Sequence, residues 1–279
     1  MTRVPEAMTP DELLRLAGAA IGAARRAGAA ILEVYDRVDV GLRSKDDDSP
    51  LTVADLHAQR VLETELAALT PAWPLLSEEA ASVPFATRAA WARYWLVDPL
   101  DGTKEFLSHN DEFTVNVALI DAHRPVLGVV HVPALRQTYW AVAGHGAWCE
   151  DDRAPSTPAR RLSVARCSGV PVRVVASRSH RGRTLDAFLK ALGEHELLSV
   201  GSALKFCLVA EGKADVYPRL GPTSEWDTAA AQAVVEAAGG AVLDLAGVPL
   251  RYNCKEDLLN PHFVVIGPND RPWLDLLRS

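Results

Sequence analysis

Apolar residues recur at three- and four-residue intervals through the first part of the chain, which is the spacing of one helical face. Thr9 and Glu12 have the spacing of a capping box, so we expect a helix to begin there and to end near Tyr35. Its length and one-sided pattern predict a long amphipathic helix. The apolar face would consist of Leu14, Ala17, Ile21, Ala24, Ile31 and Tyr35.

A polar segment, SKDDDSPLTVAD at 44–55, leads into a second helix that we expect over roughly 53–69. Thr52 and Asp55 have the spacing of an N-cap residue and the third helical residue, so helix capping is their simplest interpretation. A cap does not exclude a functional role for the same residues.

The middle of the chain is predicted to form strands. Two short apolar segments, 74–76 and 94–97, each end in carboxylates. After them, three β-rich runs are separated only by short turns, which is typical of an antiparallel meander. These runs are 114–120, 126–132 and 138–142.

The second half of the chain alternates strands and helices, the pattern of an α/β layer. Between the halves, residues 151–163 are rich in Pro, Ala, Arg and Ser and suit a linker or a surface hairpin. We therefore divide the chain into an N-terminal α+β half, 1–155, with the antiparallel sheet, and a C-terminal α/β half, 156–279. In the second half we expect strands at 172–176, 197–200, 216–217, 241–245 and 263–266, and helices at 184–192, 203–211 and 228–238.

Composition excludes several classes of protein. Lys and Arg total 29 and Asp and Glu total 36, a formal charge of −7, and no basic run suggests a nucleic-acid partner. The four cysteines form no C-x-x-C pair, which argues against zinc and suits buried thiols in a reducing compartment. No signal peptide is recognisable, and no apolar run approaches the roughly 18 residues of a membrane-spanning helix. We expect a cytoplasmic protein without a transmembrane segment, and peripheral association with the inner face of the cell membrane is left open.

The segment YWLVDPLDGTKEF, 94–106, is the most informative stretch of the sequence. Four apolar residues predict a buried strand that ends in two carboxylates, Asp98 and Asp101. Because Pro99 fixes one φ angle, the two acids could flank a tight turn that points the Leu100 carbonyl the same way. Asp-Pro and Asp-Gly each occur in ordinary turns, but both together after a buried strand favour a chemical site.

Four carboxylates at the edges of predicted strands or helices form a candidate metal site: Glu78, Asp98, Asp101 and Asp227. They offer only hard oxygen ligands, which suit Mg²⁺ better than zinc or copper. Without cations the cluster would repel itself, by about 4 kcal/mol for a pair 4 Å apart at an effective dielectric near 20. Asp227 alone could equally be a helix cap. The free backbone N–H groups at 102–104 would suit a phosphate beside the ions.

Four motifs together resemble the inositol monophosphatase superfamily of metal-dependent, lithium-sensitive phosphatases: KDDDSPLTVAD (45–55), LLSEEA (75–80), DPLDGTKEF (98–106) and GPTSEWDTAA (221–230). Further stretches resemble its 3'(2'),5'-bisphosphate nucleotidase subgroup: SRSH (177–180), GSALKFCLVAEG (201–212) and YPRLGPT (217–223). The resemblance covers nearly the whole chain. It implies a layered αβαβα sandwich and two or three Mg²⁺ ions in each active site.

The resemblance also implies roles for individual residues. Asp47 would be the catalytic base and Thr103 would orient the attacking water, although the adjacent Asp46 and Asp48 leave the identity of the base open. Inositol phosphatases have a Glu where this chain has Arg219, and a cation there suits a second phosphate. The metal ligands would be Glu78, Asp98, the Leu100 carbonyl, Asp101 and Asp227. The substrate would contact Glu78, Leu100, Asp101, Gly102, Thr103, His180, Ser202, Lys205, Arg219 and Asp227.

These implications predict a Mg²⁺-dependent phosphoric monoester hydrolase that uses an activated water. Its substrate would be a small phosphorylated nucleotide, adenosine 3',5'-bisphosphate, cleaved to AMP and phosphate, with its sulfated form as a further candidate. Such an enzyme would serve sulfur assimilation or nucleotide recycling. The alternatives are an inositol monophosphatase and a non-catalytic sensor of bisphosphorylated nucleotides, and the presence of Asp47 and Thr103 argues against the sensor.

Overall fold

The first helix forms as its sequence predicts. In the computed structural model, α1 spans Pro10–Tyr35, and the Glu12 amide donates to Thr9 Oγ1 at 3.2 Å while the Thr9 amide donates to Glu12 Oε2 at 2.8 Å. The helix packs closely on a sheet, since a Cβ on Gly28 would lie 2.6 Å from the His131 ring. The structure describes residues 8–37, 50–166, 169–177, 183–268 and 271–278, without the side chains of 50–52 and 183.

Seven strands form the first sheet in chain order, from β1 to β7. β1 runs parallel to β2, and every later neighbouring pair is antiparallel. The predicted meander is correct, and β6 extends it beyond what the sequence pattern indicated. The strands are β1 Leu75–Ser77, β2 Arg93–Asp101, β3 Thr114–Asp121, β4 Arg124–Val132, β5 Gln137–Val142, β6 Gly146–Asp151 and β7 Arg160–Arg161.

The second sheet has five strands in the order β11-β12-β10-β8-β9. β8 is parallel to both β9 and β10, whereas β12 is antiparallel to β10 and β11. All five strands expected in the second half are present. They are β8 Val172–Ser177, β9 His195–Val200, β10 Val216–Arg219, β11 Ala241–Asp244 and β12 Phe263–Ile266.

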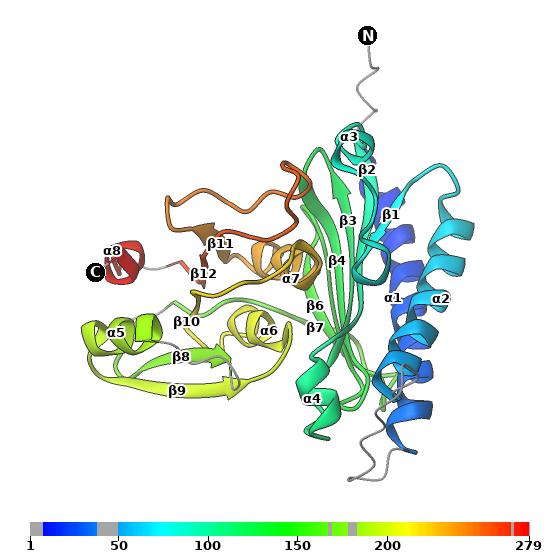
Figure 1. Cartoon of the computed structure of the whole chain (residues 1–279). Coiled ribbons are helices and arrows are strands. Elements are labelled where there is room, and N and C mark those ends of the chain that lie inside the picture. The colour runs from blue at the N-terminus through cyan, green and yellow to red at the C-terminus, as the bar shows by residue number, and fades with distance from the viewer. Residues whose placement is uncertain (1–7, 38–49, 167–168, 178–182, 269–270, 279) are drawn as a thin grey trace.

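Helices cover both faces of both sheets, which gives five layers (Figure 1). α1 and α2 lie outside the first sheet, α6 and α7 lie between the sheets, and α5 and α8 lie outside the second. This is the αβαβα sandwich that the resemblance implies. The helices after α1 are α2 Pro50–Leu69, α3 Phe85–Arg88, α4 Thr103–Leu107, α5 Arg183–Leu192, α6 Leu204–Ala210, α7 Glu225–Ala237 and α8 Trp273–Arg278, with a 3₁₀ turn, η1, at Glu78–Ala80.

A glycine contact brings α7 onto the first sheet. A Cβ on Gly128 of β4 would lie 2.1 Å from the Ala230 carbonyl oxygen and 2.8 Å from Ala233 Cβ. Only glycine can therefore occupy this position without displacing the helix. The small residues of α7 permit the close approach, and the first turn of α7 comes to lie at the end of β2.

Two boundaries differ from the sequence predictions. α2 begins at Pro50, so Thr52 and Asp55 lie inside the helix and the capping interpretation is wrong. A proline at the first helical position needs no hydrogen-bond donor, which explains the earlier start. The expected linker at 151–163 contains β7, which still pairs with β6.

No helix among the described residues is both long and apolar enough to cross a membrane.

Candidate active site

A β-bulge in β2 brings Asp98 and Asp101 to the same side of the sheet. Asp98 pairs with Asn116 and Asp101 pairs with Thr114, so β2 has one residue more than β3 between these pairs. Residues three apart on a regular strand face opposite sides, and the extra residue reverses that alternation. The tight turn expected here is therefore a bulge inside a longer strand, in which the Leu100 amide donates to Asp98 Oδ1 at 3.0 Å.

Asp227 joins the two β2 carboxylates from the first turn of α7. One oxygen each of Asp98, Asp101 and Asp227 lie within 4.8 Å of one another. Asp227 Oδ2 also accepts the Ser224 amide at 2.9 Å, as part of a capping box that starts α7. Asp227 thus caps its helix and faces the other carboxylates at the same time.

Glu78 reaches the cluster from the strand beside β2. Because β1 and β2 are parallel and Ser77 pairs with Val97, the residues that follow them meet at one edge of the sheet. Glu78 is hydrogen-bonded to Asp98 there. Ser77 Oγ donates to Gln59 Oε1 at 2.6 Å, which fixes the end of β1 against α2. The four predicted carboxylates therefore converge.

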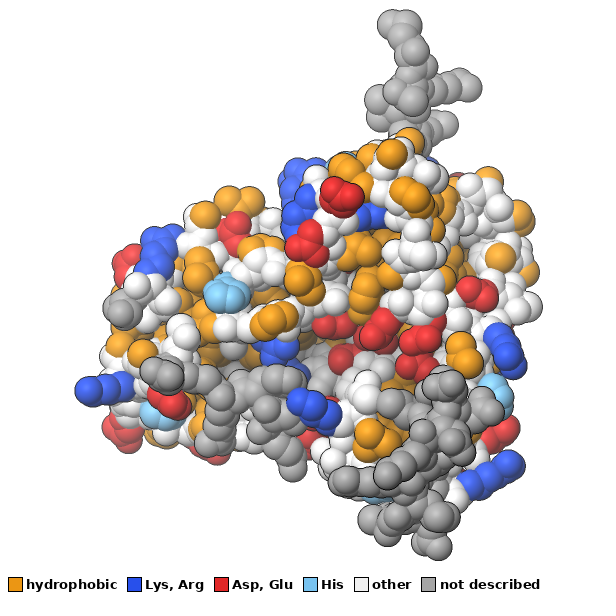
Figure 2. Space-filling view, in the orientation of Figure 1, with side chains coloured by type: hydrophobic (Ala, Val, Ile, Leu, Met, Phe, Trp, Pro, Cys, Tyr) orange, Lys and Arg blue, Asp and Glu red, His pale blue; other side chains and the backbone are white. Residues whose placement is uncertain are grey.

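Burial and mutual repulsion raise the pKa values of these acids. The Asp98 side chain is buried, and its pKa lies well above the usual range because of that burial and then because of the Asp101 charge. The pKa of Asp227 is raised to about 7, mainly by burial and secondly by repulsion from the Asp101 charge. Asp55, which faces Glu79, has its pKa raised to about 8 by burial and then by the Glu79 charge. Acidic side chains gather around a hollow at the centre of the face in Figure 2.

The donor set fits Mg²⁺. Asp98, Asp101, Asp227 and Glu78 present only carboxylate oxygens. Burial is the first cause that raises their pKa values, and the Asp101 charge is the second for Asp98, Asp227 and Glu78. A divalent cation would favour the charged form of all four, since it attracts every carboxylate of the cluster.

Two polar residues that the sequence analysis missed orient Asp101. Thr114 Oγ1 and Asn116 Nδ2 each donate to Asp101 Oδ2 at 3.4 Å, and both residues are fully buried. They alternate along β3, so they face the same side of the sheet. The only indication in the sequence is a pair of polar residues two apart at the start of a largely apolar strand.

A cavity of about 250 Å³ opens beside the carboxylates, between the two sheets. Its lining unites acidic and basic residues from both halves of the chain. Glu105, Ser177, Tyr217 and the Lys104 side chain line it without having been predicted. The predicted residues that line it are Asp101, Gly102, Thr103, Ser202, Lys205, Arg219 and Asp227.

Two of the cations that line the cavity, Lys205 and Arg219, come from the second half of the chain. Lys205 is buried and donates to the Ser202 carbonyl at 2.6 Å, and burial lowers its pKa to about 8. Arg219 donates to Thr223 Oγ1 at 2.5 Å and to the Pro222 carbonyl at 2.6 Å. Both cations are thus positioned by the protein before any ligand binds.

Ser202 has an unused hydroxyl in this cavity. Its Oγ is buried and has no hydrogen-bond partner among the described residues. Ser202 does not cap α6, whose N-cap residue is Ala203. Because an unsatisfied buried hydroxyl is costly, a ligand oxygen would be a suitable partner for it.

Two predicted site residues, Asp47 and His180, lie outside the described residues. Leu100 is buried beside Asp98, and the use of its carbonyl as a metal ligand stays a prediction.

Comparisons with known proteins agree with this arrangement. The profile of the Inositol monophosphatase family matches residues 12–272. Proteins from Salmonella typhimurium and Escherichia coli K12, both named 3'(2'),5'-bisphosphate nucleotidase CysQ, are 50% identical to this chain over 243 and 244 residues. Each alignment covers 87% of this chain and 96% of the relative.

Solved structures share the architecture. The crystal structure of CysQ from Bacteroides thetaiotaomicron, a bacterial member of the inositol monophosphatase family, superposes with a TM-score of 0.80 at 43% identity. The superposition covers 91% of this chain and 97% of the CysQ chain. An inositol monophosphatase from Zymomonas mobilis, 21% identical, has the same fold with a TM-score of 0.77 over 98% of this chain and 100% of its own. This chain belongs to the inositol monophosphatase family.

Proposed function

We propose that this protein is a Mg²⁺-dependent 3'(2'),5'-bisphosphate nucleotidase that hydrolyses adenosine 3',5'-bisphosphate to AMP and phosphate. The observation on which this rests is a single cavity lined by carboxylates of the metal-type cluster and by two cations, Lys205 and Arg219. A substrate with two phosphates matches this lining, because the ions would bind one phosphate and the cations the other. The names of the relatives at 50% identity support the same assignment.

Different residues of the chain have different roles in hydrolysis. Mg²⁺ held by Glu78, Asp98, Asp101, Asp227 and the Leu100 carbonyl would polarise the phosphate, lower the pKa of water and neutralise the leaving oxygen. Asp47 takes the proton of the attacking water, which Thr103 orients. Lys205 and Arg219 bind the second phosphate.

Gly102 has the backbone conformation that a phosphate-binding turn requires. Its φ angle is 99°, and a Cβ would lie 3.2 Å from Phe113 Cα and 3.3 Å from Ser202 Cβ. Only glycine tolerates this position, and residues 102 and 103 both line the cavity. We assign their two backbone amides to the oxygens of the scissile phosphate.

Inositol monophosphatase activity is the nearest rival. Inositol 1-phosphate has one phosphate and neutral ring hydroxyls, so it would leave one of the two cations without an anionic partner. The deciding experiment measures phosphate release with Mg²⁺ from adenosine 3',5'-bisphosphate, its sulfated form, adenosine 3'-monophosphate and inositol 1-phosphate. A native preference for inositol 1-phosphate would reject the nucleotide assignment.

Mg²⁺ should stabilise the fold, because cations relieve the repulsion within the carboxylate cluster. At a hundredfold excess over its dissociation constant the ion adds about 2.7 kcal/mol to the free energy of unfolding. For a chain of this size that raises the melting temperature by about 5–10 °C. Thermal unfolding with Mg²⁺ and with EDTA measures the difference, and identical curves would reject a metal site here.

Arg219→Ala should lower kcat/KM for adenosine 3',5'-bisphosphate by about 10- to 150-fold, the value of one hydrogen bond from a charged group. Adenosine 3'-monophosphate, which lacks the second phosphate, should be cleaved almost as before. Steady-state kinetics on both substrates provide the measurement, and an equal loss on both would contradict the assignment.

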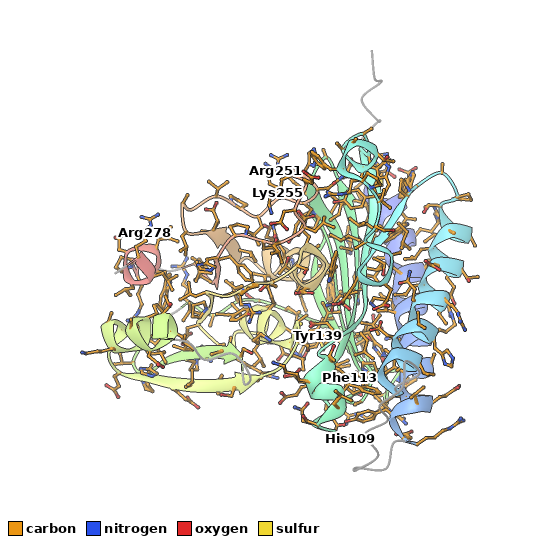
Figure 3. All side chains as sticks on the ribbon, viewed as in Figure 1. His109, Phe113, Tyr139, Arg251, Lys255 and Arg278 are labelled. Carbon is orange, nitrogen blue, oxygen red and sulfur yellow. The ribbon has the colours of Figure 1, made fainter. Side chains whose placement is uncertain are left out.

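Two controls separate the charge of Arg219 from its structural contacts. Thr223→Val removes the hydroxyl that accepts from Arg219 Nε but keeps the guanidinium, so it should cost much less activity. Arg251→Ala removes an exposed guanidinium far from α4 (Figure 3) and should leave both substrates unaffected.

A further inference from the structure

We infer that Glu112 is a positioning residue that holds the connection between β9 and α6, and with it Ser202 and Lys205, against the catalytic carboxylates. The inference rests on the proposed function, in which Ser202 and Lys205 bind substrate. Glu112 itself belongs neither to the carboxylate cluster nor to the residues that line the cavity.

Two carboxylates of the first half hold the β9–α6 connection by its backbone. The Gly201 amide donates to Glu112 Oε2 at 2.8 Å, and the Ala203 amide donates to Asp101. The two amides flank Ser202. Since Asp101 also belongs to the metal-type cluster, Glu112 is the anchor that can be removed without changing that cluster.

Ser202 has a conformation that needs such anchors. Its φ angle is 46°, in the left-handed region that L residues other than Asn and Asp seldom adopt. The Ser202 carbonyl accepts from Lys205 Nζ at 2.6 Å. The Ser202 carbonyl shares its peptide with the Ala203 amide, which Asp101 holds, and Glu112 holds the chain two peptides earlier, at the Gly201 amide. Glu112 therefore acts on Lys205 by fixing the chain that leads into the peptide to which the ammonium group is bonded.

A side chain of the first half packs directly against the Gly201 backbone. A Cβ on Gly201 would lie 2.3 Å from Glu105 Cγ, so the buried Glu105 side chain fills the space beside it. With that space filled, the backbone at Gly201 cannot move closer to the first half of the chain. The hydrogen bond to Glu112 then holds the amide in place.

Glu112 is itself fixed by the loop that precedes β3. Its amide donates to Asn110 Oδ1 at 3.1 Å, and the neighbouring Asp111, with φ 66°, accepts from the Tyr35 hydroxyl at 2.9 Å. The Tyr35 ring stacks on His109 with centroids 4.3 Å apart. Figure 3 shows His109 and Phe113 together beside α4. The loop is thus anchored to the end of α1 and presents Glu112 to the second half of the chain.

The test compares Glu112→Ala and Glu112→Gln with the native protein in two measurements. Amide hydrogen exchange of peptides covering 199–207 reports the anchor directly, and steady-state kinetics on adenosine 3',5'-bisphosphate and adenosine 3'-monophosphate report its effect on substrate binding. Glu150→Ala is the matched control, because it removes a carboxylate that accepts from Arg25 and Trp140 away from the cavity.

In Glu112→Ala we expect exchange at Gly201 to become about tenfold faster or more, since the loss of a charged acceptor frees the amide. KM for the bisphosphate should rise about tenfold with kcat nearly unchanged, and the monophosphate should be unaffected. Glu112→Gln, which retains an acceptor oxygen, should recover most of both losses. Glu150→Ala should show neither effect.

Unchanged exchange in Glu112→Ala would overturn the inference, and so would an equal loss of activity on both substrates. A native protein that does not prefer the bisphosphate would instead reject the proposed function. In that case the exchange measurement alone decides whether Glu112 holds the connection.

Discussion

Asp98→Asn should lower kcat/KM by about 10³-fold or more, the upper range for losing one electrostatic group that acts on the reacting phosphate. Asp98 lies at the centre of the carboxylate cluster, where Asp101 and Asp227 contribute oxygens within 4.8 Å. The amide keeps the oxygen that accepts the Leu100 N–H, so the bulge in β2 should persist. The fold should survive while Mg²⁺ loses a charged ligand.

Melting curves distinguish this result from unfolding. Without metal the Asp98→Asn protein should melt at or above the native temperature, because one of several repelling charges is gone. The increase in melting temperature that Mg²⁺ produces should be smaller than in the native protein. Asp121→Asn, in the same sheet and paired with Arg93, should keep full activity. Near-native turnover by Asp98→Asn would contradict the metal assignment.

Asp47→Asn should lower kcat by about 10² to 10⁴, the usual effect of removing a positioned general base. The residue accepts a proton in the proposed reaction and is not a metal ligand, so the Mg²⁺-dependent rise in melting temperature should remain. Single-turnover phosphate release at saturating Mg²⁺ measures the chemical step, and thermal unfolding measures the metal.

Asp46→Asn and Asp48→Asn are the matched controls, because the three acids are consecutive and differ only in position. Each control should retain most of the native rate. A larger loss in either of them than in Asp47→Asn would reassign the base to that residue.

Much of the site could be predicted because its chemistry is local in the sequence. Asp98 and Asp101 lie at the end of a buried strand, and Asp227 lies in the first turn of a helix of small residues. Such features depend on residues within one or two turns of one another. The same locality explains the capping error at Asp55: the spacing suits a cap, but Pro50 also suits the first position of a helix, and the helix begins there.

Other residues had no local pattern by which to find them. Thr114 and Asn116 matter because β3 pairs with the bulged end of β2, which brings their donors to Asp101. Glu112 is one acid in a polar loop, and its partner Gly201 is 89 residues away in the sequence. Contacts of this range are decided by strand order and register, which no short motif encodes.

The sequence by itself therefore determined most strands and helices of both halves, the types of ligand and the acidic and basic residues of the site, because polarity and helix or strand periodicity act over short distances. Only the tertiary structure decided that Asp98 and Asp101 face the same way and that Asp227 joins them. It also decided that Lys205 and Arg219 line one cavity of about 250 Å³ together with Asp101 and Asp227. The physical reason is that a bulge reverses the side-chain alternation of a strand, and that Gly128 lets α7 approach the sheet closely enough for the two halves to share one site.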